Sequence, residues 1–336
     1  MKKLKRIFAV FFCLLLASGI LGGCGKAASS SAPAPSASQS GSKPLKIVTT
    51  IFPEYDWVRE ILGDKTDHAE VTMLLDNGVD LHSYQPTADD IIKISDCDLF
   101  IYVGGESDGW VEDALKEAAN KDMQVINLLD ALGEQVKEEE VVEGMEAEEE
   151  ESEDEDEPEY DEHVWLSLKN AETLCNAITD ALEEIDPANK DAYAANAASY
   201  LEKLAALDGE YQAVVDNAVR KTVLFGDRFP FRYLVDDYGL SYYAAFAGCS
   251  AETEASFETI SFLAGKVDEL GLPCVLTIEG AQHKIAETIV QNSAAKNQSI
   301  LALDSMQSTT SADAANGTTY LSVMESNLDV LKQALN

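Results

Sequence analysis

Short apolar runs alternate with amphipathic stretches along most of this chain. The runs lack the period of two that marks a half-exposed strand, so they predict strands buried on both faces of a parallel sheet. Four runs precede the middle of the chain and four follow it: Lys46–Phe52, Val71–Leu75, Leu99–Val103, Val125–Leu128, Thr222–Phe225, Ser241–Phe246, Cys274–Ile278 and Ser299–Leu303.

Helical patterns separate these runs. Thr87 is followed three residues later by Asp90, which predicts a capping box at the start of a helix just after Pro86. The predicted helices outside the middle of the chain are Asp56–Leu62, Thr87–Ile94, Asn170–Ile185 and Thr318–Leu335.

The longest helical pattern runs from Asp186 to about Val219, with Asp186 as the expected N-cap and Pro187 at the first helical position. At 1.5 Å per residue this helix would be about 50 Å long, which suits a strut between two lobes. We therefore predict an α/β fold of two lobes, each a mostly parallel sheet flanked by helices, joined by one long rigid linker helix. The expected boundaries are 45–185, 186–220 and 221–336.

The first residues predict export. A basic start precedes an apolar stretch, Ile7–Ala17, that is too short to span a bilayer. Leu21-Gly22-Gly23-Cys24 then resembles the lipobox of bacterial lipoproteins. We expect a signal peptide over 1–23, lipidation of Cys24, a flexible tether over 24–44, and a protein anchored by lipid to the extracytoplasmic face of the cell membrane.

Charge and cysteine content narrow the range of partners. The chain has 61 acidic against 24 basic side chains, a net charge of −37, which repels nucleic acid and attracts cations. Seventeen acids fall among the 25 residues Glu138–Glu162, which we expect to be disordered, serving either solubility or weak cation capture. We interpret the remaining cysteines as small buried hydrophobes, with a Cys249–Cys274 disulfide as the first alternative to examine. They are Cys97, Cys175, Cys249 and Cys274.

Ligand-type side chains gather where the predicted strands end. Open α/β sheets bind ligands beyond the carboxyl ends of their strands, so two lobes placed face to face could bring these side chains together. Imidazole with carboxylate suits Zn²⁺ and also Mn²⁺ or Fe²⁺. The residues are His82 and His163 in the first lobe and Asp227, Glu279 and Asp304 in the second.

Several segments carry a family resemblance in the same order along Lys46–Leu335. "DLHSYQPTADDI", "DLFIYVGG", "DEHVWLSLKNA", "DDYGL" and "LTIEGAQHKIAETI" resemble the metal-binding lipoproteins of bacterial ABC importers for zinc and manganese. The resemblance implies two lobes around one rigid helix, a metal bound between them, and delivery to an ABC permease. It implies that His82 in "H-x-Y-x-P", His163 in "H-x-W-L" and Asp304 are ligands.

The chain departs from this family at the third ligand, which falls on Arg228. Arginine stays protonated and cannot ligate a metal. Asp227 could substitute, with Arg228 then pairing with Glu279 beside the site. The acid that usually follows "H-x-W-L" is Ser167 here. Two histidines with two carboxylates would make a harder set of ligands than the three histidines of the family's zinc-binding members. Mn²⁺ and Fe²⁺ therefore stay alternatives to Zn²⁺ as the bound ion.

We therefore predict a monomeric, non-enzymatic receptor, most simply for zinc, whose partners are an ABC permease and a divalent ion and which meets the membrane through its anchor alone. One alternative is an exported metallohydrolase, although the sequence contains no H-E-x-x-H or G-x-S-x-G motif. Another is a receptor for an organic ligand whose carboxylate Arg228 would bind.

Overall fold

The computed structural model describes residues 43–146, 159–250, 254–280 and 283–336. The predicted signal peptide, Cys24 and nearly all of the tether lie outside these residues. Within them, no helix combines the length and apolarity needed to cross a membrane.

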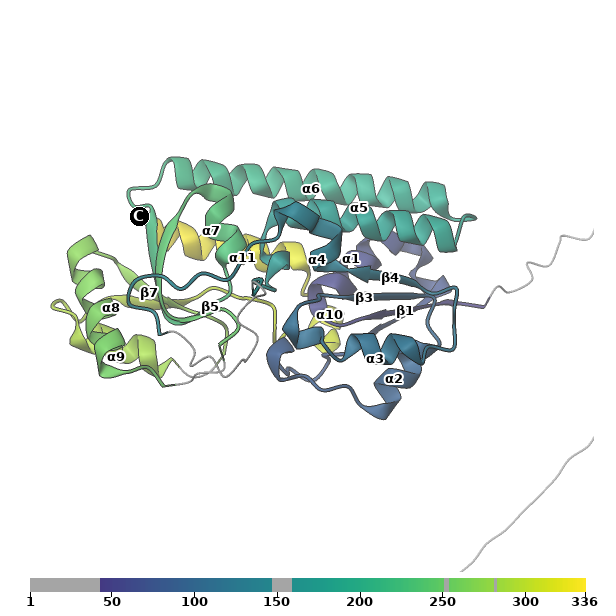
Figure 1. Ribbon diagram of the computed structural model, residues 1–336. Helices are drawn as coiled ribbons and strands as arrows, with labels where there is room; N and C mark the ends of the chain where they lie inside the picture. Colours follow the sequence, from purple (N-terminus) through teal and green to yellow (C-terminus); the bar gives the residue numbers. More distant parts are fainter. Residues whose placement is uncertain (1–42, 147–158, 251–253, 281–282) are drawn as a thin grey trace, which may run out of the picture. The chain divides into compact units, whose positions relative to one another are not determined.

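The first sheet has four parallel strands in the order β2-β1-β3-β4. In Figure 1, α1 and α5 lie on one side of it and α2 and α3 on the other. The predicted capping box is confirmed, since the Thr87 hydroxyl accepts from the Asp90 amide and the Asp90 carboxylate accepts from the Thr87 amide. The elements are β1 (Leu45–Thr49), α1 (Phe52–Leu62), β2 (Ala69–Met73), α2 (Ala88–Ser95), β3 (Leu99–Tyr102), α3 (Val111–Lys116), β4 (Gln124–Asn127) and α4 (Leu128–Leu132).

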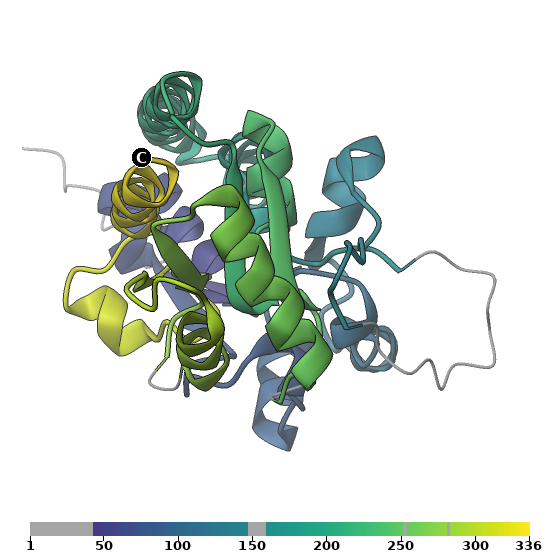
Figure 2. The same ribbon diagram turned by 90° about the vertical axis from the view of Figure 1, so that its left-hand side faces the viewer.

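The second sheet repeats this arrangement, with four parallel strands in the order β6-β5-β7-β8. Helices α8 and α9 cover one of its faces (Figure 2), and α11 contacts β5 and β7. All eight predicted strands are therefore present. The elements are β5 (Thr222–Phe229), α7 (Arg232–Tyr238), β6 (Ser241–Ala247), α8 (Phe257–Leu270), β7 (Cys274–Thr277), α9 (Lys284–Asn292), β8 (Ser299–Ala302), α10 (Ser311–Ala315) and α11 (Tyr320–Leu335).

The predicted long helix is α6, Lys190–Asp216, which follows α5, Leu168–Ile185. It packs against α1 and α5 beside the first sheet and against α7 and α11 beside the second (Figure 1). The expected start at Asp186 is wrong. The Asp186 carboxylate instead accepts hydrogen bonds from the side chain of Asn189 and from the hydroxyl of Tyr193. It thus stabilises the turn between α5 and α6.

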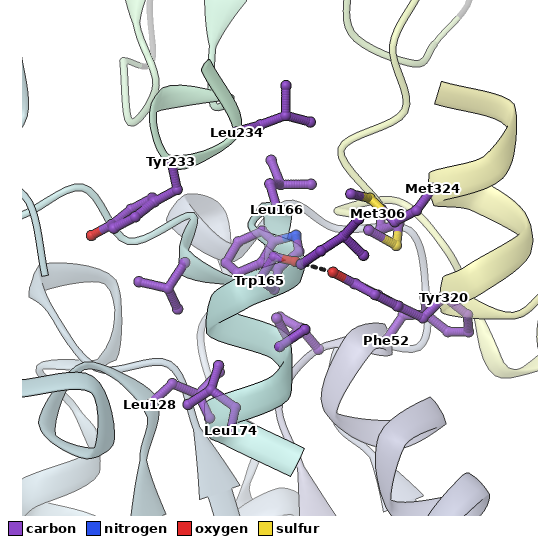
Figure 3. Packing of buried hydrophobic residues seen from close by; sticks show 14 of the residues in the cluster. Phe52, Leu128, Trp165, Leu166, Leu174, Tyr233, Leu234, Met306, Tyr320 and Met324 are labelled. Atoms are coloured by element: carbon purple, nitrogen blue, oxygen red, sulfur yellow. Dashed lines mark hydrogen bonds between the residues drawn. The ribbon is translucent and has the colours of Figure 1, made fainter. Parts of the chain in front are cut away.

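Buried aromatic residues belong to a hydrophobic cluster that contains residues of both sheets (Figure 3), and a second, smaller cluster lies between the second sheet and helices α8 and α9. The Trp165 indole donates to the carbonyl of Ser305 at 2.9 Å, and the Tyr320 hydroxyl donates to the carbonyl of Trp165 at 2.7 Å. The amide of Tyr320, at the start of α11, donates to the carboxylate of Asp56 in α1. The C-terminal helix of the second lobe is therefore hydrogen-bonded to the first lobe. The two lobes share buried contacts that the sequence analysis did not predict.

The acidic run is not disordered at its described ends. Glu138 pairs with Tyr160 in an antiparallel bridge, and Glu146 pairs with Phe246 at the edge of β6. Residues 147–158 lie outside the described part. At the described ends the expectation was wrong, because the count of charges took no account of the buried Met145 or of the backbone groups that pair with the second sheet. The four cysteines that lie in the described residues are free, so the alternative Cys249–Cys274 disulfide is absent.

Candidate metal centre

His82 is held in a short turn after β2. The turn Leu81–Ser83 is capped by Asp80, whose Oδ1 accepts from the His82 amide at 3.0 Å. The ring Nδ1 lies 2.8 Å from the hydroxyl of Ser107, in a turn that follows β3. The segments that follow β2 and β3, the two strands on either side of β1, thus fix this imidazole at the carboxyl ends of the strands.

His163 is fully buried and is fixed by the last acids of the acidic run. Oδ1 of Asp161 accepts from the His163 amide at 2.8 Å and lies 3.0 Å from the ring Nδ1. A carboxylate beside Nδ1 favours the tautomer with the proton there, which leaves Nε2 free to donate its lone pair. Asp161 therefore contacts the imidazole directly and is buried, although it belongs to the run that was expected to be disordered.

The two imidazoles face each other through their Nε2 atoms, 3.2 Å apart. Burial and the neighbouring His163 lower the pKa of His82 to about 3, so His82 is neutral at physiological pH. Oε2 of Glu162 lies 3.4 Å from Nδ1 of His82 and has no hydrogen-bond partner, while its Oε1 accepts from the Ser107 amide. Two opposed lone-pair donors, each with a polar partner behind it, form an arrangement that can hold a cation.

A third ligand-type atom reaches this pair from the second lobe. Among the described residues, His82, His163 and Cys249 form the group of potential ligands whose atoms all lie within 4.8 Å of one another. The sequence analysis missed Cys249 because it treated the cysteines as core. The strand-end rule would have found it, since Cys249 lies two residues beyond the end of β6.

Asp227 does not join this group, although it was expected to ligate. β5 continues to Phe229, so Asp227 lies within the strand and not at its end. A register shift between Phe225 and Arg228 turns its carboxylate toward β7, where Oδ2 accepts from the amide of Ile278 at 3.3 Å. Burial raises the pKa of Asp227, although hydrogen bonds from the amides of Arg228 and Ile278 act to lower it.

Asp304 and Glu279 also lie outside the group. Oδ1 of Asp304 accepts from the Met306 amide at 2.8 Å, in a turn after β8. Burial and nearby Glu279 raise the pKa of Asp304 to about 6. Glu279 accepts from the amides of Ser305 and Gln307, so it supports the same turn and not the metal group. Neither carboxylate belongs to the described group of ligand-type atoms around His82 and His163, and ligation by Asp304 stays a prediction.

Arg228 pairs with Asp80, which corrects its expected pairing with Glu279. Its Nη2 lies 2.5 Å from Oδ2 of Asp80, and this ion pair joins the two lobes beside His82. Burial opposes ionisation of Asp80, but the guanidinium prevails and lowers the pKa of this carboxyl group. Arg228 thus binds a carboxylate beside His82, whose Nε2 is 3.9 Å from Oδ1 of Asp80.

Comparisons with known proteins agree with this architecture. A family profile described as "Zinc-uptake complex component A periplasmic" matches residues 47–334. The chain is 31% identical to the high-affinity zinc uptake system protein ZnuA of Bacillus subtilis over 337 residues, covering 99% of this chain and 98% of that protein. It is 33% identical to the zinc-binding lipoprotein AdcA of Streptococcus pneumoniae, covering 86% of this chain but only 55% of AdcA.

Solved structures share the fold. The Zn(II)-bound ZnuA-like domain of Streptococcus pneumoniae AdcA superposes with a TM-score of 0.67 at 30% identity, covering 87% of this chain and 99% of that domain. The metal-dependent lipoprotein YcdH of Bacillus subtilis gives a TM-score of 0.69 at 28% identity, covering 87% and 99% of the two chains. With this profile match and this fold, the chain belongs to the family of zinc-uptake complex component A, a family of solute-binding proteins.

Proposed function

We propose that this protein captures Zn²⁺ outside the cytoplasm and delivers it to an ABC permease. The observation that carries the proposal is the pair of opposed Nε2 atoms of His82 and His163, 3.2 Å apart. Neutral imidazole nitrogen is a preferred zinc ligand, and second partners at Nδ1 fix its orientation. The zinc-binding names and the zinc-bound structure of the relatives support the same ion.

His82 and His163 are the two ligands proposed from the first lobe. Asp161 and Ser107 orient their rings through Nδ1. The geometry favours these residues over Asp227 and Asp304, whose carboxylates accept hydrogen bonds from nearby backbone amides. Because the low pKa keeps His82 neutral, the ion does not have to displace a proton from this ring at physiological pH.

The cellular setting follows from the leader and the family. Cys24 carries the lipid anchor, residues 24–44 tether the folded part, and the protein acts as a monomer at the extracytoplasmic face of the membrane. A permease is its protein partner, as for a component of an uptake complex. We propose no catalytic activity, since the opposed imidazoles serve capture and release of the ion.

The alternatives fit the geometry less well. An organic ligand would need a free Arg228, but its guanidinium is engaged by Asp80. Mn²⁺ favours oxygen ligands, and neither Asp227 nor Asp304 is in the described group of close ligand-type atoms around the imidazoles. We do not propose a hydrolase, because hydrolysis would need a general base beside an open metal position in addition to the metal ligands.

Elemental analysis of protein purified without added metal tests the proposal. We expect one zinc per chain in the wild type and in His68→Ala, a control at an exposed histidine, and none in the His82→Ala, His163→Ala double variant. A double variant that retains stoichiometric zinc would refute these ligands. Stoichiometric manganese in the wild type would refute zinc as the ion captured.

A further inference from the structure

The residues of the second lobe that were expected to ligate, Asp227 and Asp304, are not in the group of close ligand-type atoms around His82 and His163. Arg228 occupies the expected position and is bound to Asp80, and Asp227 is turned toward β7. Within the described ranges, Cys249 is the ligand-type residue that the second lobe contributes to the group around His82 and His163. A zinc site built from two imidazoles alone would be incomplete, since structural and capture sites normally use three or four ligands.

The loop that carries Cys249 is fixed against the first lobe. The Cys249 amide donates to Oε1 of Glu139 at 3.2 Å, and the backbone of Glu162 lies within hydrogen-bonding reach of its sulfur. A Cβ on the preceding Gly248 would lie 3.0 Å from Cε1 of His163, so this backbone packs directly onto the imidazole. The loop that carries the thiol thus packs against residues of the first lobe as well as against Phe229 of its own lobe.

A second observation also points to a bound cation. The Glu162 side chain is 3% exposed, and its Oε2 has no hydrogen-bond partner while lying 3.4 Å from Nδ1 of His82. A buried carboxylate oxygen left in this state is costly unless positive charge is nearby. A divalent ion on the other side of the His82 ring would supply that charge, through the imidazole that Glu162 faces.

We propose that Cys249 is the third protein ligand, so that a His82, His163 and Cys249 site binds zinc across the two lobes. This inference rests on the proposed function. As the S–Zn bond forms, the thiol proton passes to solvent and no electron is transferred. A thiolate is a soft ligand that selects Zn²⁺ over the harder Mn²⁺, so Cys249 would set the ion preference that Asp227 was expected to set.

Cobalt substitution tests the sulfur ligand directly. The full chain loaded with Co²⁺ should show a thiolate-to-metal charge-transfer band in the near ultraviolet. Cys249→Ser should lose the band, whereas Cys274→Ser, at a buried free cysteine on β7, should keep it. A wild-type spectrum without this band overturns the proposal, and that measurement does not depend on whether any variant folds.

Ion competition gives an independent readout. Loss of an outer-shell partner lowers metal affinity about 10–100-fold, so Cys249→Ser should weaken zinc by about 100-fold or more. Cys249→Asp should shift the ratio of zinc to manganese affinity toward manganese. If Cys249→Ser binds zinc as tightly as wild type while the double histidine variant does not, the sulfur ligand is refuted and the zinc receptor stands. If the wild type binds no zinc, both proposals fall.

Discussion

Variants of Asp161 can distinguish two effects of this residue on His163, which are the orientation of the imidazole and its electrostatic stabilisation. Its Oδ1 accepts from both the amide and the Nδ1 of His163, at 2.8 and 3.0 Å, and its side chain is 3% exposed. Asp161→Asn keeps an oxygen that can accept both hydrogen bonds but loses the negative charge. Asp161→Ala loses both and leaves the imidazole without a partner.

Loss of such a partner lowers metal affinity about 10–100-fold, which corresponds to about 1.4–2.8 kcal/mol. We expect Asp161→Asn near the lower limit and Asp161→Ala near the upper one. Zinc affinity would be measured by competition with a fluorescent chelator. Asp122→Asn, at an exposed aspartate, is the matched control and should bind zinc as the wild type does.

Unfolding curves recorded with chelator present would show whether either variant has lost its fold. The reasoning would be refuted if a folded Asp161→Ala bound zinc within about threefold of wild type. A lower zinc affinity of Asp161→Asn than of Asp161→Ala would also contradict it, because the effects of charge and of orientation on affinity would then not be additive.

Two further predictions concern stability. Burial raises the pKa of Glu54 from 4.5 to about 8, so the folded state keeps a proton that the unfolded chain releases, and stability should fall as pH rises between these values. The full difference corresponds to about 5 kcal/mol. Urea unfolding of the chelated protein at pH 5 and pH 8 should show the decline, and Glu54→Gln should reduce it while Glu134→Gln, at an exposed site, should not. Arg228→Ala should destabilise the fold by about 1–3 kcal/mol because it leaves Asp80 without its partner, and adding Asp80→Asn should recover part of this loss. Equal stability of the single and double Arg228 variants would argue against the cross-lobe ion pair.

Local sequence signals located the elements but not all of their ends. Thr87 and Asp90 predicted a helix start because a capping box depends on residues three positions apart. Asp186 was misread because its carboxylate is used by Asn189 and Tyr193, which fold back onto it after α5 has ended. The preference of aspartate for the N-cap position could not show whether Asp186 caps the next helix or accepts hydrogen bonds within the turn before it.

The candidate site shows the same division. His82 and His163 were found because each lies in a short segment that resembles the family and follows a strand or precedes a helix. The failure at Asp227 is tertiary, since the bulge in β5 depends on pairing with β6 and on the close approach of α9. A Cβ on Gly226 would lie 2.6 Å from the backbone of Ala286 in α9.

The sequence by itself determined two parallel sheets, a long helix and a pair of imidazoles, because apolar periodicity and motif spacing act over a few residues. Only the tertiary structure decided which side chains of the second lobe meet those imidazoles. Cys249 is 86 residues from His163 along the chain, and packing of Gly248 against the ring brings its sulfur into the group. Arg228 and Asp80 are joined for the same reason, since their contact exists only once both sheets and the helices between them have packed.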